Sequence, residues 1–128
     1  MPERSLVSVV EDDEFFRASM RRLMRSMGYR VETFASAADF LASSCLDETA
    51  CLIADVNMPA MSGIELYGHL LDTGHPIPTI LVTAYADDRV ESRALKQGVI
   101  GYLQKPVDED HLRRCLHVVL EFREGSVD

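Results

Sequence analysis

Several features that mark whole classes of protein are missing from this sequence. No apolar run approaches the roughly 20 residues that a membrane-spanning helix needs. Basic residues are in the minority, 13 against 21 acidic ones, which gives a net charge of −8. A broad basic surface for a nucleic-acid backbone is therefore not expected. These absences argue against a membrane protein and against direct nucleic-acid contact by this chain.

Cysteine is scarce as well. Cys45, Cys51 and Cys115 make an odd count, and none stands in a CxxC or a mixed Cys/His metal-binding spacing. We predict free thiols that act mainly as small buried hydrophobic residues. The four histidines also lack a metal-binding spacing and are predicted at the surface: His69, His75, His111 and His117.

The composition that is present is that of an ordinary globular domain, with 47% hydrophobic and 27% charged residues over 128 positions. We expect a single domain over residues 1–128, with residues 1–4 and 123–128 as terminal extensions. Because residues 1–4 lead straight into a strand-like run, we expect no signal peptide and a cytoplasmic location.

Strand-like and helix-like segments alternate five times along the chain. Apolar, partly β-branched runs predict strands at residues 6–10, 29–34, 51–55, 79–83 and 100–104. The helices are expected to begin near Asp13, Ser36, Ser62, Asp87 and Asp108, the two serines opening capping boxes, and the last helix to run to Phe122. Gly28, Gly74 and Gly98 are expected to end three of them.

Five such units predict an α/β fold, a doubly wound parallel sheet of five strands with helices on both faces. The strand order 2-1-3-4-5 is one of the few that right-handed crossovers allow. The segment at residues 29–34 alternates polar and apolar side chains, which predicts an edge strand.

Chemically useful side chains stand where four of the strands end. The acidic run 11–13 follows the first strand, Asp55 closes the third, Thr83 closes the fourth and Lys105 follows the fifth. In a parallel sheet these ends share one edge, which is the edge where open α/β proteins bind ligands. Carboxylates, a hydroxyl and an ammonium would then meet in one crevice, which suits a small cation and a phosphoryl group.

The acids predict a magnesium site. Mg²⁺ prefers oxygen ligands and keeps several waters, so Asp12 and Asp55 are the candidate direct ligands, with the backbone carbonyl of Asn57 as a third. Glu11 has a longer side chain and is expected to act through a water, whereas Asp13 is expected to cap the following helix.

The same cation would let Asp55 act as a nucleophile toward phosphorus, because it screens the charge of the incoming phosphoryl group. Lys105 offers a compact positive charge and Thr83 a hydroxyl for the phosphoryl oxygens. Ala84 keeps the approach open, and Pro106 restrains the chain after Lys105.

Taken together, these motifs resemble a known family over essentially the whole chain. They read VVEDD at residues 9–13, ADVNMPAMSGIEL at 54–66, TAYA at 83–86 and GYLQKP at 101–106. The chain resembles the receiver domain of bacterial two-component response regulators, with a pattern most like the nitrogen-fixation and nodulation regulators. Glu11 is a departure, since the family more often has aspartate there, and this could alter metal affinity or the dephosphorylation rate.

The resemblance implies a flavodoxin-like receiver fold and a phospho-acceptor that is not an enzyme but supports its own phosphorylation and dephosphorylation. Asp55 would take a phosphoryl group from a histidine kinase or a phosphotransfer protein, with Mg²⁺ held by Asp12, Asp55 and the Asn57 carbonyl and with Glu11 in the outer part of the site. Thr83 and Lys105 would contact the phosphoryl oxygens. Tyr102 matches the family's switch aromatic.

The output face is expected on the fourth helix, fifth strand and fifth helix, with Val90, Ala94 and Tyr102 as candidate partner contacts. Val90 and Ala94 equally fit core packing. The resemblance allows an output domain, a separate target protein or a phosphorylation-dependent homodimer as partner. Both a stand-alone receiver and a piece of a longer DNA-binding regulator stay open.

Two other functions fit parts of the pattern. Acids after two strands loosely resemble Mg²⁺-dependent phosphotransferases and hydrolases, including nucleic-acid-cleaving folds, but the amide of Asn57 cannot transfer a proton where those enzymes need an acid. An interaction module that is not phosphorylated is the second alternative. The intact set of Asp55, Thr83 and Lys105 argues against it.

Overall fold

The structure of the protein is a computed structural model, in which residues 5–121 are described. Its five strands form one sheet in which every neighbouring pair is parallel. The order is β2-β1-β3-β4-β5, as predicted, and the alternating strand β2 does lie at an edge. The strands are β1 (Leu6–Val10), β2 (Arg30–Phe34), β3 (Thr49–Asp55), β4 (Thr79–Thr83) and β5 (Gly101–Gln104).

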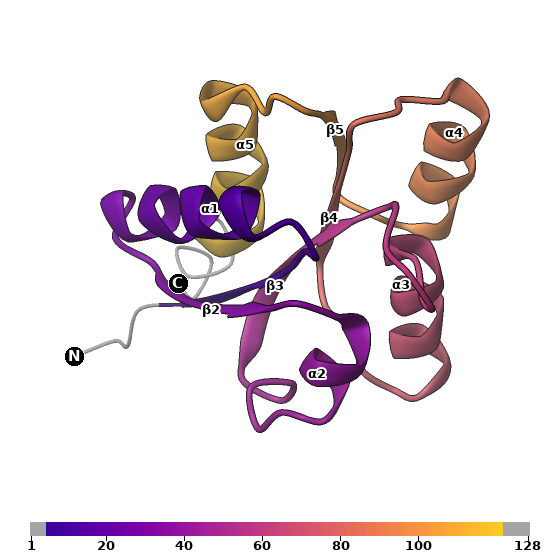
Figure 1. Cartoon of the computed structure of the whole chain (residues 1–128), viewed down its shortest axis with the longest axis horizontal. Coiled ribbons are helices and arrows are strands. Elements are labelled where there is room, and N and C mark those ends of the chain that lie inside the picture. The colour runs from indigo at the N-terminus through magenta and orange to yellow at the C-terminus, as the bar shows by residue number, and fades with distance from the viewer. Residues whose placement is uncertain (1–4, 122–128) are drawn as a thin grey trace.

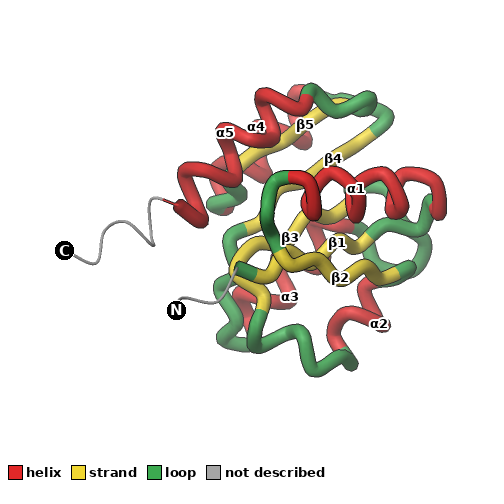
Figure 2. The backbone as a smooth tube through the Cα atoms, turned by 90° about the vertical axis from the view of Figure 1, so that its left-hand side faces the viewer, coloured by secondary structure: helices red, strands yellow, loops and turns green. Residues whose placement is uncertain are grey.

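Helices cover both faces of this sheet (Figure 1), and Figure 2 shows the strands, in yellow, running between them. They are α1 (Glu14–Ser26), α2 (Ala37–Leu41), α3 (Gly63–Asp72), α4 (Asp88–Gln97) and α5 (Glu109–Leu116), and α5 continues into a π-helical turn, η1 (His117–Glu121). The π-turn was not predicted, and the predicted helix end at Phe122 lies outside the described residues.

The side chains of the strands pack into two separate cores, one on each face of the sheet, because neighbouring residues of a strand point to opposite faces. In β3, Cys51 and Ile53 join the core under α1 and α5, whereas Leu52 and Ala54 join the core under α2, α3 and α4. Strands β1, β3 and β4 are buried on both faces, as continuous apolar runs predict, whereas the edge strand β2 is only partly buried.

The helix ends follow the predicted capping chemistry. Asp13 accepts hydrogen bonds from the backbone of Phe15 and Phe16, so it caps α1 as expected. Ser62 and Glu65 form a complete capping box at α3, whereas Ser36 supplies the serine half at α2. The three helix-ending glycines have positive φ angles of 91°, 81° and 111°, a conformation that side chains with a Cβ resist: Gly28, Gly74 and Gly98.

Some predicted details were wrong. Strand β3 begins two residues before the predicted start, at Thr49, because the Thr49 hydroxyl reaches Ser8 Oγ at 2.7 Å and donates to the Cys45 carbonyl at 2.6 Å, so a threonine can be buried there. His75 lies at the surface as predicted, with 35% of its side chain exposed and Asp47 at 3.4 Å from its Nε2. The three cysteines are free thiols as predicted, but Cys51 alone is buried among them.

No helix within residues 5–121 combines the length and the apolar character that spanning a membrane requires.

Candidate functional site

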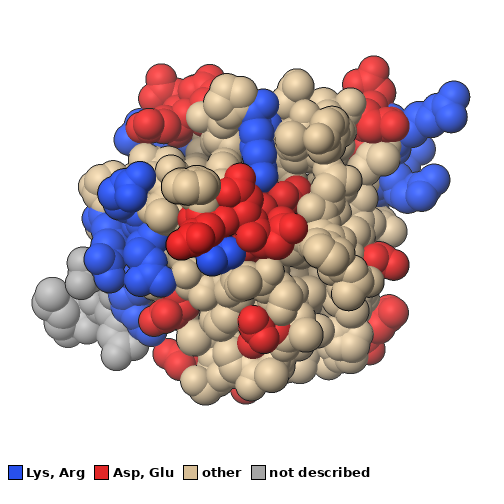
Figure 3. Space-filling model, in the orientation of Figure 1, with Lys and Arg blue, Asp and Glu red and all other residues tan. Residues whose placement is uncertain are grey.

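The strand register brings the predicted site residues to one edge of the sheet. Asp55, the last residue of β3, pairs with Val82 of β4, and Thr83, the last residue of β4, pairs with Gln104 of β5. Glu11 and Lys105 are the first residues after β1 and β5. All these ends are carboxyl ends of parallel strands. Acidic side chains accordingly gather near the centre of the face in Figure 3, where α1 begins.

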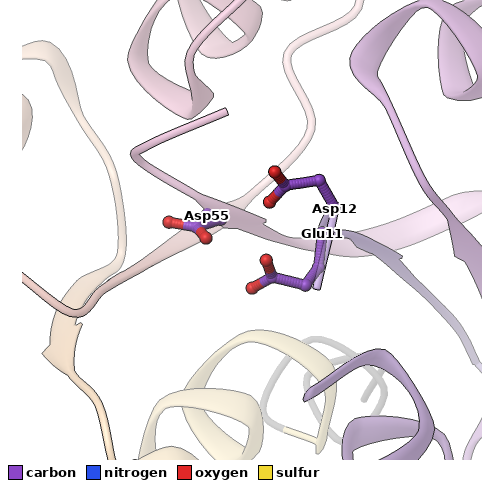
Figure 4. Close-up of side chains that lie close together, drawn as sticks. All are labelled: Glu11, Asp12 and Asp55. Carbon is purple, nitrogen blue, oxygen red and sulfur yellow. The ribbon is translucent and has the colours of Figure 1, made fainter. Parts of the chain in front are cut away.

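Three carboxylates meet at this edge. One oxygen each from Glu11, Asp12 and Asp55 lies within 4.8 Å of the other two, and the side chains point toward a common space (Figure 4). Asp55 and Glu11 are buried, whereas Asp12 is exposed. The two buried acids occupy the inner wall of the site and Asp12 its outer rim.

This crowding changes the protonation of Glu11. Burial raises the pKa of Glu11 from 4.5 to about 7; the ammonium of Lys105 and the backbone N–H of Asp13 oppose this rise, and the neighbouring Asp55 reinforces it. Both carboxylate oxygens of Glu11 have partners, since Oε1 accepts from Lys105 Nζ at 2.7 Å and Oε2 accepts from Asp13 N at 3.0 Å.

Lys105 bridges the two buried acids. Its Nζ donates to Asp55 Oδ2 at 3.2 Å as well as to Glu11, and only 17% of its side chain is exposed. Burial alone would lower the pKa of Lys105, but the hydrogen bonds to Glu11 and Asp55 outweigh burial and raise it. The peptide bond from Lys105 to Pro106 is cis.

The second oxygen of Asp55 leads to Thr83 through Asn57. Asp55 Oδ1 accepts from the backbone N–H of Asn57 at 2.9 Å, and Asn57 Nδ2 donates to Thr83 Oγ1 at 2.9 Å. The buried Thr83 hydroxyl also accepts from the backbone N–H of Tyr85 at 3.0 Å. Two donors therefore occupy the acceptor lone pairs of this hydroxyl, and its O–H remains the donor that is predicted to contact a phosphoryl oxygen.

The donor set fits Mg²⁺, the ion that the fold and the acids imply. Three carboxylate oxygens in one partly open space are hard ligands, and a cation among them would offset the cost of ionising Glu11, whose pKa is raised mainly by burial and further by Asp55. Asp12 and Asp55 remain the candidate direct ligands. Asn57 lies in the turn right after β3, so its carbonyl stays a predicted third ligand, and a role for Glu11 through water stays a prediction too.

The residues proposed for the output face lie in different environments. Tyr102 is half-buried, and its hydroxyl accepts from the N–H of Asp87, the N-cap of α4, at 3.4 Å. Val90 is half-buried. Ala94 is fully buried in the core under α3 and α4, so in this conformation it packs inside the molecule and offers no surface to a partner. Ala84 is exposed and leaves the edge open.

Two members of the site and one role were not predicted from the sequence. Phe16 places its ring 4.2 Å from Lys105 Nζ, Arg17 donates to the carbonyls of Glu11 and Asp12 at 2.9 and 3.3 Å, and the predicted Asn57 uses its side chain as well. In the sequence, Phe16 recurs with Met20 and Leu23 at helical spacing, which a core role explains. Arg17 carried no signal that separates it from a solvent-exposed helix residue.

A doubly wound sheet of order 2-1-3-4-5 with acids, a threonine and a lysine at its carboxyl edge defines the class of receiver domains. The family model described as "Response regulator receiver domain" matches residues 7–117. The chain belongs to this family.

Relatives of known name point the same way. Nodulation protein W of Bradyrhizobium diazoefficiens is 38% identical over 109 residues, which cover 85% of this chain and 48% of the relative. Transcriptional regulatory protein FixJ of Azorhizobium caulinodans is 36% identical over 85% of this chain and 52% of its own. The predicted likeness to nodulation and nitrogen-fixation regulators is confirmed. The chain spans about half the length of these curated relatives.

Solved structures confirm the fold. Response regulator StyR superimposes with a TM-score of 0.85 at 38% identity, covering 94% of this chain and 61% of that one. The FixJ-N structure gives a TM-score of 0.81 at 29% identity, covering 94% of this chain and 96% of that one.

Proposed function

We propose that this domain is a phospho-acceptor switch of a two-component system, with Asp55 as the acceptor. One observation carries the proposal: Asp55 is buried at the end of β3 with a lysine ammonium 3.2 Å from one oxygen and two further carboxylates facing it. A buried carboxylate beside an ammonium and two further acids suits the uptake of a negatively charged phosphoryl group together with a cation.

In the proposed reaction, a carboxylate oxygen of Asp55 attacks the phosphorus of a phosphohistidine. The new P–O bond forms as the P–N bond breaks, and its electron pair returns to the imidazole nitrogen of the donor. When bound, Mg²⁺ supplies neutralisation of the phosphoryl charge, and Asp12, Asp55 and the Asn57 carbonyl would hold it, with Glu11 acting through a water. Lys105 then contacts a phosphoryl oxygen from its place beside Asp55.

The switch follows from the bonds of Thr83. When its O–H donates to a phosphoryl oxygen, Thr83 moves toward Asp55, and this movement weakens the bonds that its oxygen accepts from Asn57 Nδ2 and the Tyr85 N–H. Tyr102 then turns inward, away from the start of α4. The result is a shift of a pre-existing equilibrium on the face formed by α4, β5 and α5, where Val90 and Tyr102 are the proposed partner contacts.

The proposed partners follow from the same role. A histidine kinase or phosphotransfer protein supplies the phosphoryl group in the cytoplasm, and an output domain, a target protein or a second copy of the domain receives the signal. The relatives named above include transcriptional regulators, which supports an output in transcription. Neither a nucleic acid nor a membrane is a proposed partner of this domain.

Incubation with acetyl phosphate and Mg²⁺, followed by intact-mass measurement and product analysis, tests the proposal. We expect one added phosphoryl group per chain and its loss with time. Catalytic turnover of a phosphorylated substrate without a labelled protein would instead indicate a phosphotransferase or hydrolase. An unchanged mass and no turnover would indicate an interaction module, and either result would reject the proposal.

A further inference from the structure

Phe16 makes a contact with Lys105 that the proposed reaction does not use. Its ring centroid lies 4.2 Å from Lys105 Nζ, within the range at which an ammonium is attracted to an aromatic face. Phe16 sits in the first turn of α1 and is half-buried, packed against the core under α1 and α5. The preceding residue, Phe15, is 84% exposed, so two adjacent phenylalanines have opposite environments.

Among residues 5–121, the Lys105 ammonium therefore has three partners: the Glu11 carboxylate, the Asp55 carboxylate and the Phe16 ring. In the proposed reaction, the bond to Asp55 is the one that changes, because an Asp55 oxygen becomes bonded to phosphorus. The contacts with Glu11 and Phe16 are the two that keep the ammonium at the site while this happens.

We propose that Phe16 is a positioning residue for Lys105, a role that rests on the proposed function of the site. Lysine has a long side chain that loses much rotational freedom when it is held in one place. A ring that already confines the ammonium beside Asp55 removes part of this cost before the phosphodonor arrives. Because Lys105 would contact phosphoryl oxygens of the bound donor as well as of the transition state, the ring mainly strengthens donor binding.

An aliphatic residue at position 16 could fill the same half-buried space, but it has no face of negative potential for the ammonium. The aromatic character of Phe16, and not its bulk alone, is therefore the property that the inference concerns. Phe16→Leu removes the ring and keeps an apolar side chain, whereas Phe16→Tyr keeps the ring. Phe15→Leu makes the matched change at the exposed neighbour.

The first measurement is the rate of phosphorylation by acetyl phosphate with Mg²⁺ as a function of donor concentration. We expect Phe16→Leu to raise the half-saturating concentration roughly three- to tenfold, with a smaller change in the maximal rate. Phe16→Tyr and Phe15→Leu should keep the wild-type concentration. The small donor makes no docking contact with the surface of α1, so Phe15 serves as a clean control.

The second measurement needs no phosphorylation. In the NMR spectrum of the unphosphorylated protein, ring currents should move the Lys105 side-chain methylene protons upfield in the wild type and in Phe16→Tyr, and Phe16→Leu should lose this shift. If the wild type takes up no phosphoryl group, the proposed function fails, yet this spectrum still reports on the Phe16–Lys105 contact.

Any of three results would overturn the inference. The first is an unshifted Lys105 spectrum in the wild type, and the second is wild-type donor saturation in Phe16→Leu. The third is a Phe16→Tyr variant that is impaired as much as Phe16→Leu, with equal losses of melting temperature, since packing alone would then explain the residue.

Discussion

The proposed switch depends on Thr83, whose hydroxyl oxygen already accepts two hydrogen bonds in the unphosphorylated protein. Its oxygen accepts from the Asn57 side chain and from the Tyr85 backbone. Both bonds use acceptor lone pairs of the hydroxyl, so its O–H can still donate to a phosphoryl oxygen. We expect the phosphoryl contact to draw Thr83 toward Asp55 at the expense of these two bonds, so that the energy gap between the two states stays small, as a reversible switch needs.

Thr83→Ala with Asp55 intact should still accept a phosphoryl group but respond poorly, because the nucleophile and the metal ligands lie on other strands. Losing the hydroxyl should remove about 1–3 kcal/mol of the bias toward the active state. The measurement compares amide NMR shifts over residues 87–104 with and without beryllofluoride, which stands in for the phosphoryl group on Asp55.

Thr79→Ala is the matched control, since Thr79 is a buried threonine at the other end of β4 whose hydroxyl donates to the Ile77 carbonyl. A full wild-type shift pattern in Thr83→Ala would show that Thr83 is a structural residue.

Residue types and their place at strand ends were enough to predict most of the site, because a parallel sheet brings carboxyl ends together. The partners within the site could not be predicted. Lys105 and Glu11 are 94 positions apart, and which oxygen each donor reaches depends on side-chain length and rotamer. A role for the extra methylene of Glu11 and for the ring of Phe16 can be assigned only from the positions of α1 and β5 in the structure.

The elements themselves were largely predictable, since apolar runs, capping residues and helix-ending glycines agree along the chain. The failures have local causes. The hydroxyls of Thr49 and Ser8 form a hydrogen bond inside the sheet. A prediction of strands from apolar runs does not include such a buried polar residue. Ala94 lies on a helix with many polar residues, and only the way α4 packs on the sheet decides that Ala94 faces inward.

The position of α3 depends on one close approach to β3. A Cβ at Gly63 would lie 2.5 Å from the Asp55 carbonyl oxygen and 3.1 Å from a Leu81 methyl carbon. Gly63→Ala should therefore push the start of α3 away from the acceptor strand and destabilise the fold by about 1–3 kcal/mol.

Gly68→Ala provides the control within the same helix, because nothing lies within 4 Å of its Cβ position. It should stabilise the protein by about 0.5–1 kcal/mol, since glycine is a poor helix former. Urea unfolding of both variants tests the prediction, and equal effects of the two alanines would refute the close contact.

The whole molecule should respond to Mg²⁺ in a way that depends on pH. The pKa of Glu11 is raised from 4.5 to about 7 in the folded protein, so the unfolded chain loses this proton at a lower pH than the folded protein does. Without a cation, stability therefore falls as pH rises from about 4.5 to 7, and the full cost is present above pH 7. We expect Mg²⁺ to bind the ionised cluster in the folded state and to offset that cost.

Thermal melts with millimolar Mg²⁺ and with a chelator should thus differ clearly at pH 7.5 and little at pH 5. At a free concentration of a hundred times its Kd, the ion would add about 2.7 kcal/mol. A melting temperature at pH 7.5 that is indifferent to Mg²⁺ would contradict the proposed metal site.

The most direct test of the central claim is to locate the phosphoryl group on the chain. Wild-type protein treated with acetyl phosphate and Mg²⁺ is reduced with borohydride, which converts an aspartyl phosphate into homoserine, and the peptides are then sequenced by mass spectrometry. The same treatment is applied to Asp55→Asn, which should melt like the wild type because the amide is nearly isosteric but lacks the anionic nucleophile. We expect homoserine at position 55 of the wild type and no labelling of the variant. Homoserine at another acidic residue, or labelling of a folded Asp55→Asn at the wild-type rate, would contradict the assignment of Asp55 as the acceptor.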